Sequence, residues 1–210
     1  MGKNIAMLKC FSRVLSNDKK EIEKILPNMY AESFYTIDVD FLLKEKINKL
    51  ILDIDGTLLP VDDTNVPDKL TKRIEEIKNK NIDVCLVSNN NEERVKPVAI
   101  KLKTKYLANA NKPLKEAYEN AIKLLNAKKN NVAMVGDQMM SDIKGGNNYG
   151  LYTILVKPVS KHNNIKTGTS RILQNIMEKH LKKQGIFDSN KYYKKGMVKW
   201  PHIMKQILIK

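Results

Sequence analysis

The sequence predicts an α/β fold of the Rossmann-like kind, in which about five parallel strands are covered by helices on both faces. From about residue 50 onward, short apolar segments alternate with longer amphipathic ones, which is typical of a parallel sheet with crossover helices. Three of the apolar segments end in acidic or small polar residues, at the edge where open α/β sheets bind ligands. A chain of 210 residues is long enough for one such domain.

Each element is predicted from its apolar spacing and from its flanking residues. The expected strands are short apolar runs at 49–55, 82–87, 105–109, 132–135 and 151–156. The expected helices are segments with apolar residues three and four apart, at 67–80, 91–101, 113–127, 139–148 and 169–184. Pro67 and Pro113 are expected at helix starts, because proline suits the first turn of a helix.

Three regions are expected along the chain. Residues 1–46 should form a helical segment packed on the core, 47–186 the core itself, and 187–210 a basic amphipathic extension. Only 24 positions separate Ser88 from Lys112, and one helix and one strand use them. A separate cap domain would need about 50 residues or more, so we expect no large cap and an open site.

The strand at 49–55 delivers two aspartates, Asp53 and Asp55, to the ligand edge of the sheet. Residues two apart on a strand point to the same side. One carboxylate can therefore attack a substrate while the other handles protons, and a divalent cation can neutralise both. Because buried, unpaired carboxylates are costly, a metal ion or a cationic side chain is expected beside them.

Further polar residues follow the other strands in order. Ser88 comes directly after the strand at 82–87, Lys112 precedes a predicted helix, and Asp137 and Asp142 follow the strand at 132–135. Each has an ordinary alternative. Gly136-Asp137 could form a simple turn, Ser88 could cap a helix, and Lys115 competes with Lys112. Their order, each at the end of its element, favours one functional site.

These four segments resemble the motifs of the haloacid dehalogenase-like (HAD) phosphohydrolases: DxDGT, a Ser or Thr, a Lys, and GDxxxD. The resemblance covers roughly residues 47–160. It implies that Asp53 is the nucleophile that forms an aspartyl-phosphate. It also implies that Asp55 is the general acid and then the general base, and that Ser88 and Lys112 hold the phosphoryl oxygens.

The resemblance also implies a Mg²⁺ cofactor, because Mg²⁺ prefers oxygen ligands. Its ligands would be Asp53, the backbone carbonyl of Asp55, and Asp137, and Asp142 would orient a metal-bound water or pair with Lys112. Backbone N–H groups after Asp53 would cradle the phosphoryl group. The phosphate-binding residues expected are Ile54, Gly56, Thr57 and Asn89.

A narrower resemblance extends over about residues 24–185. The segments at 26–33, 37–43, 87–95, 135–138, 142–147 and 153–156 are similar to those of the YqeG family of type IIIA, capless HAD phosphatases. That family is similar to the phosphatidylglycerophosphate phosphatases, so the resemblance implies dephosphorylation of phosphatidylglycerophosphate at the cytoplasmic membrane face. The family commonly has Asn at the position of Gly56.

Positive charge is concentrated at the C-terminal end. Residues 157–210 hold 13 basic and two acidic residues. Such a segment attracts phosphate-rich polymers or anionic lipid surfaces, whereas a solvated charged face is the ordinary alternative. One apolar set at helical spacing is expected to pack on the sheet: Ile172, Leu173, Ile176, Met177 and Leu181. A second set would dock on the domain or lie in a membrane interface: Trp200, Ile203, Met204, Ile207 and Leu208.

The remaining composition excludes several other classes. Cys10 and Cys85 do not make a disulfide framework, and the three histidines lack metal-ligand spacing. No signal peptide and no apolar run of about 18 residues is present, so a cytoplasmic protein with peripheral membrane contact is expected. A phosphatase for soluble or nucleic-acid-linked phosphates is the alternative. A basic RNA- or ribosome-binding module without catalysis is disfavoured by the intact set of motif residues.

Overall fold

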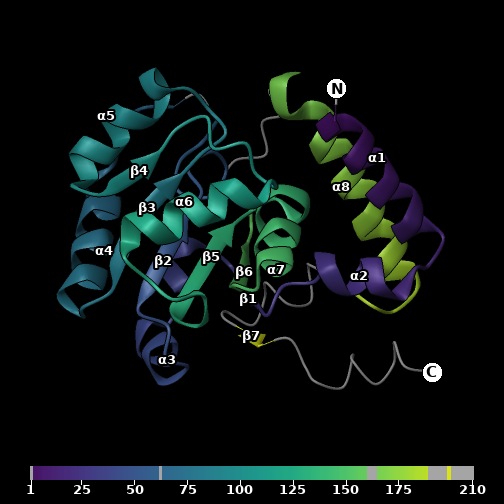
Figure 1. Ribbon diagram of the computed structural model, residues 1–210, viewed down its shortest axis with the longest axis horizontal. Helices are drawn as coiled ribbons and strands as arrows, with labels where there is room; N and C mark the ends of the chain where they lie inside the picture. The colour runs from purple at the N-terminus through teal and green to yellow at the C-terminus, as the bar shows by residue number, and fades with distance from the viewer. Residues whose placement is uncertain (1, 62, 160–164, 189–197, 200–210) are drawn as a thin grey trace.

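A computed structural model describes residues 2–61, 63–159, 165–188 and 198–199 (Figure 1). In these ranges the strands form one sheet in the order β4-β3-β2-β5-β6-β1-β7. All neighbouring strands are parallel except β1 and β7, which are antiparallel. The strands are β1 Met29–Ala31, β2 Lys49–Leu52, β3 Asp83–Val87, β4 Lys105–Leu107, β5 Val132–Gly136, β6 Tyr152–Val156 and β7 Val198–Lys199.

Helices cover both faces of this sheet, as predicted. The α-helices are α1 Gly2–Leu15, α2 Lys19–Ile25, α3 Val39–Lys44, α4 Asp68–Asn79, α5 Glu92–Leu102, α6 Lys115–Leu125, α7 Gly145–Tyr149 and α8 Ile165–Lys183. Two 3₁₀ turns, η1 Phe34–Thr36 and η2 Lys129–Asn131, and a π-helical turn, η3 Met139–Lys144, complete the set. Several helices begin at acidic or amide caps: the Asp18, Asp38 and Asn91 side chains each accept a backbone N–H of the first turn.

The strands divide the core because successive side chains point to opposite faces. On β2, Leu50 and Leu52 face one apolar cluster, with α3, α4 and α5, and Ile51 faces the other side, with α6. Tyr30 of β1 and Leu155 of β6 join a third cluster with α1, α2 and α8. Figure 1 shows α1, α2 and α8 together at one end of the sheet, beside α7.

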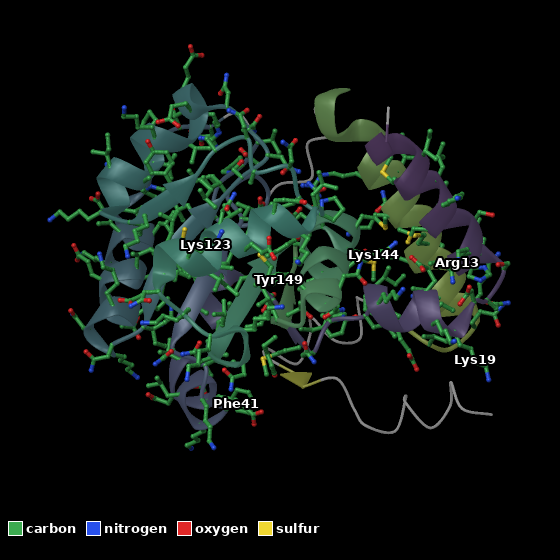
Figure 2. The ribbon with its side chains drawn as sticks, viewed as in Figure 1. Arg13, Lys19, Phe41, Lys123, Lys144 and Tyr149 are labelled. Atoms are coloured by element: carbon green, nitrogen blue, oxygen red, sulfur yellow. The ribbon has the colours of Figure 1, made fainter. Side chains whose placement is uncertain are left out.

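Ion pairs tie the N-terminal helices to the core. The carboxylate of the buried Glu21 in α2 forms an ion pair with Arg13 of α1 at 3.1 Å and a second one with Lys144 at the end of η3. Figure 2 shows Arg13 on α1 and Lys144 on the side of α7 that faces α1 and α2. These contacts join α1 and α2 to η3, and they bring the segment before β2 into the same folded unit.

Three expectations need correction. The segment 1–46 contains a strand, β1, which was not predicted because three residues are too few to show a period of two. The third predicted strand ends at Leu107. Helix α6 begins at Lys115 rather than at Pro113, since Leu114 still has an extended backbone (φ −65°, ψ 144°).

The C-terminal helix differs in part from its predicted packing. Met177 and Leu181 of α8 are buried against α1 and α2, but Ile172 is 56% exposed and Ile176 is 42% exposed. One helix cannot bury five apolar residues spread over such an arc when it lies at the end of the sheet instead of across it. The second apolar set, Trp200 to Leu208, lies outside the described residues.

The connections around the ligand edge are short. From β2 to α4 the described chain makes one tight turn, bridged between Asp55 and Leu59, and from β3 to α6 it forms α5 and β4 alone. No cap domain is therefore inserted at either point within the described residues. None of the described helices has both the length and the apolar composition required to cross a membrane.

Candidate active site and metal site

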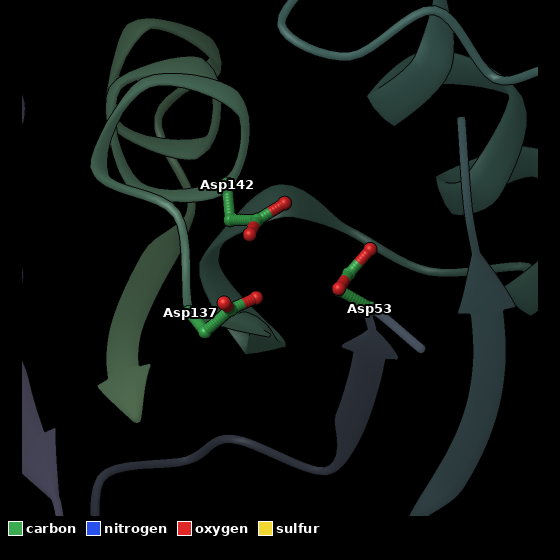
Figure 3. A group of neighbouring side chains, drawn as sticks. All are labelled: Asp53, Asp137 and Asp142. Atoms are coloured by element: carbon green, nitrogen blue, oxygen red, sulfur yellow. The ribbon is translucent and has the colours of Figure 1, made fainter. Parts of the chain in front are cut away.

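Three buried aspartates meet at the carboxyl ends of β2 and β5. Asp53 follows β2, Asp137 follows β5, and Asp142 lies in η3 (Figure 3). Leu52 pairs with Val135 across the two neighbouring strands, so the residues that follow them emerge side by side. One carboxylate oxygen from each aspartate lies within 4.8 Å of the other two. All three were named from the sequence. The expected metal ligands were Asp53, the Asp55 carbonyl and Asp137, and Asp142 was expected to orient a metal-bound water or to pair with Lys112.

Lys112 bridges two of these acids. Its Nζ donates to Asp53 Oδ1 at 2.7 Å and to Asp142 Oδ1 at 2.8 Å, and the whole residue is buried. Burial opposes a charged amine, but the carboxylates of Asp142 and Asp53 together raise the pKa of Lys112. Lys112 is therefore a fixed positive charge beside Asp53. Lys115, the competing candidate, instead pairs with Glu119 in an exposed position.

Asn89 holds the backbone of Lys112. Its Oδ1 accepts the Lys112 N–H at 2.6 Å, and its Nδ2 donates to the Lys112 carbonyl at 3.0 Å. These two hydrogen bonds engage both polar ends of the Asn89 amide, so the side chain positions Lys112. The phosphate contact expected of Asn89 stays a prediction.

Asp55 is held by residues that follow β3. Arg94 donates Nε at 3.0 Å and Nη2 at 2.8 Å to Asp55 Oδ1. On the other oxygen, Asn90 Nδ2 donates at 2.8 Å and Ser88 Oγ at 3.4 Å. Both Asp55 and Arg94 are buried. The Asp55 carboxylate thus faces the start of α5, while Asp53 faces Lys112.

The turn after Asp53 is tight and uses its own backbone donors. Gly56 has a φ of +92°, a conformation that glycine adopts most easily. The N–H of Gly56 donates to Leu59 at 2.7 Å, and that of Thr57 donates to Ile54 at 3.2 Å. The turn itself engages these two N–H groups, and the phosphate contacts expected of Ile54, Gly56 and Thr57 stay predictions. The Thr57 hydroxyl lies 3.2 Å from Asp53 Oδ2 and 3.1 Å from Asp137 Oδ1.

The electrostatics of this cluster fit a bound cation. Burial raises the pKa of Asp53 to about 8, although Lys112 opposes that rise. Burial likewise raises the pKa of Asp137 to about 6, opposed by Arg171. Negative charge on these buried carboxylates is unfavourable until a positive charge lies beside them. Three clustered carboxylates are also the hard oxygen donors that a divalent cation such as Mg²⁺ prefers.

Four residues in contact with the site were not singled out from the sequence. Asn90 and Arg94 contact Asp55, and Arg171 and Gln174 of α8 contact Asp137. The first pair lies in the segment at 87–95, so its place after β3 was a usable signal. The second pair had none, because α8 begins more than twenty residues after the last motif and carries ordinary amphipathic spacing.

Comparisons with known proteins agree with this geometry. A model of haloacid dehalogenase-like hydrolases matches residues 50–111, and a HAD-hydrolase-like model matches residues 109–166. The chain is 33% identical over 160 residues to the "Probable phosphatase YqeG" of Bacillus subtilis. That match covers 76% of this chain and 93% of the relative.

Two solved structures are similar at low identity. An uncharacterized protein from Listeria monocytogenes matches with a TM-score of 0.47 and 19% identity, over 56% of this chain and 85% of that one. The cobalt-bound deoxy-D-mannose-octulosonate 8-phosphate phosphatase of Haemophilus influenzae matches with a TM-score of 0.40 and 16% identity, over 70% and 96% of the two chains.

Proposed function

This chain belongs to the haloacid dehalogenase-like phosphatases of the YqeG family, and we propose that it hydrolyses phosphomonoesters through an aspartyl-phosphate on Asp53 with Mg²⁺ as its cofactor. The observation that carries the proposal is the buried cluster in which Lys112 bridges Asp53 and Asp142 beside Asp137. A buried lysine fixed between two acids is costly to build. Its positive charge is useful where the dianionic phosphate of a monoester must be held against a carboxylate.

The proposed reaction has two displacements. In the first, an oxygen of Asp53 attacks phosphorus, the bond from phosphorus to the ester oxygen breaks, and Asp55 gives its proton to the leaving oxygen. In the second, Asp55 takes a proton from water as the water oxygen attacks phosphorus. The bond to Asp53 then breaks, and inorganic phosphate leaves.

The other residues would act on charge and geometry. Lys112 and Ser88 would hold the phosphoryl oxygens that do not transfer, where negative charge spreads in the transition state. Asp53 and Asp137 would hold Mg²⁺ together with the Asp55 carbonyl, and Asp142 would fix Lys112. When bound, the cation supplies positive charge that lets a phosphoryl dianion approach the carboxylates.

For the substrate, we propose phosphatidylglycerophosphate at the cytoplasmic membrane face. Three observations support it: the family, the short connections that leave the ligand edge without an inserted cap domain, and the 13 basic against two acidic residues over 157–210. A site without a cap suits a headgroup that stays attached to a surface. A basic segment favours anionic lipid by about 1 kcal/mol for each residue near it.

The test is phosphate release from phosphatidylglycerophosphate in mixed vesicles and from a panel of soluble phosphomonoesters, with Mg²⁺ and with EDTA. We expect the lipid to give the highest kcat/KM, and EDTA to abolish release from every substrate. Asp53→Asn should lose at least about a thousandfold in rate, because its amide cannot form the acyl phosphate. A folded Asp53→Asn variant that retains a tenth of the activity would overturn the mechanism. A soluble ester preferred over the lipid would overturn the substrate assignment alone.

A further inference from the structure

Helix α8 reaches the proposed metal site from outside the motif-bearing part of the fold. Arg171 lies in the first half of α8 and Gln174 about one turn later, and both side chains are directed to the loop that follows β5. Arg171 Nη2 donates to Asp137 Oδ2 at 2.7 Å. Gln174 Nε2 donates to the Asp137 carbonyl at 3.2 Å. The helix therefore contacts both the side chain and the main chain of one aspartate.

The amide of Gln174 has a complete set of partners. Its Oε1 accepts the N–H of Met139 at 3.0 Å, and its Nε2 also donates to Glu178 Oε1 at 3.1 Å. Gln174 is buried and spans the turn from Asp137 to Met139. If the amide were turned over, its NH₂ group would face the Met139 N–H and its oxygen would face the Asp137 carbonyl. The hydrogen bonds therefore fix both the orientation of the Gln174 amide and the path of the turn.

Gly56 leaves the space through which Arg171 arrives. A Cβ atom at position 56 would lie 2.4 Å from Arg171 Nη2 and 2.6 Å from Asp137 Oδ2. Any side chain there would push the guanidinium away from Asp137 or displace the carboxylate. The turn after the nucleophile and the C-terminal helix are thus fitted to each other at the edge of the acidic cluster.

We propose that Arg171 and Gln174 are positioning residues that hold Asp137 ready for the metal, so that metal binding depends on α8. This inference rests on the proposed function, because it requires Asp137 to be a metal ligand. Arg171 donates a hydrogen bond to Oδ2 of Asp137, while Oδ1 of Asp137 lies 3.1 Å from the Thr57 hydroxyl. Partners that orient a ligating carboxylate commonly change metal affinity by about 10–100-fold when they are removed.

The test measures metal binding without substrate, using Mn²⁺ detected by electron paramagnetic resonance and its displacement by Mg²⁺. Two variants keep the local charge constant: Gln174→Leu, and Arg171→Lys, which retains the charge but loses the planar guanidinium. We expect each to weaken Mn²⁺ and Mg²⁺ binding by about 10-fold or more. Asn175→Leu, an exposed neighbour on the same helix, is the matched control and should bind as the wild type does.

Folding is checked by the melting temperature without metal. A loss of affinity in either variant, with its metal-free melting temperature within about 3 °C of the wild type, supports the proposal, because the fold is then largely intact. Affinities within twofold of the wild type in both variants would overturn it while leaving the metal site in place. A wild-type protein that binds neither ion would overturn the metal site as well.

Discussion

At the scale of single residues, the site separates its two central aspartates by giving each a different cation. Asp53 is paired with Lys112, and Asp55 is paired with Arg94. Two carboxylates placed two positions apart would otherwise repel each other and share one environment. Distinct partners allow the proposed nucleophile and the proposed acid–base group to keep separate orientations, which the proposed two-step displacement requires.

The Arg94 pair gives a test of this separation. If Arg94 orients Asp55, Arg94→Gln should slow the first displacement by about 10–100-fold for an alkyl phosphate, which needs a proton on its leaving oxygen. An aryl phosphate with an acidic leaving group should be affected much less. The rates are compared in single-turnover experiments that follow release of the alcohol or phenol.

Lys96→Gln is the control for that experiment, because it removes one exposed positive charge from the same helix. Asn90→Ala, which removes the other strong donor to Asp55, should show the same leaving-group dependence with less disturbance of the core. An equal loss on both substrates in both variants would contradict a role for Arg94 in positioning the acid.

At the scale of elements, the close approach of α6 and α7 sets the geometry behind the acidic cluster. The Tyr118 hydroxyl donates to the Ser141 carbonyl, and its ring lies against the backbone of Gly145. A Cβ at position 145 would lie 2.0 Å from the Tyr118 hydroxyl oxygen. Packing and not backbone conformation therefore favours glycine here, since Gly145 itself has an ordinary right-handed helical backbone.

Gly145→Ala should accordingly lower the free energy of unfolding by about 1–3 kcal/mol, the usual cost of forcing one extra carbon into a packed core. The measurement is urea denaturation followed by circular dichroism. Asn148→Ala, at an exposed position of the same helix, should change stability by less than about 0.5 kcal/mol. Equal stability of Gly145→Ala and the wild type would show that α6 and α7 separate at little cost.

At the scale of the whole molecule, the N-terminal segment and the C-terminal helix form one structure at the end of the sheet. Phe187 is buried and stacks on Tyr30 of β1 with ring centroids 5.0 Å apart. We propose residues 47–186 as the catalytic core, 1–46 as its N-terminal support, and 187–210 as the basic extension. Phe187, the first residue after the proposed core, packs in the same apolar cluster as Tyr30.

The basic extension provides the test at this scale. Replacing Lys191, Lys194, Lys195 and Lys205 with serine should reduce binding to vesicles that contain anionic lipid. The expected loss is about 1 kcal/mol for each residue near the surface, and it should be smaller at high salt. Activity on vesicle-borne phosphatidylglycerophosphate should fall more than activity on a soluble phosphate. Co-sedimentation and paired kinetics measure the two effects.

The matched control replaces four exposed lysines elsewhere, Lys19, Lys20, Lys72 and Lys123, and changes the net charge equally. Equal loss of vesicle binding in both variants would indicate attraction by total charge alone. Salt-sensitive binding of RNA without vesicle binding would contradict the lipid assignment and favour a nucleic-acid-linked phosphate.

The sequence alone determined the α/β class, the positions of five strands along the chain and the phosphatase family, because apolar periodicity and four ordered motifs are local signals. It also named Asp53, Asp137, Asp142 and Lys112, which meet because parallel strands end at one edge of a sheet. The tertiary structure decided what depends on distant contacts: the pairing of β1 beside β6, the arginines that face Asp55 and Asp137, and the arrival of α8 at Asp137. Those contacts join residues 34 or more positions apart. The place of Arg94 after β3 is a local signal, but no local pattern of charge or hydrophobicity encodes the partners of β1 and α8.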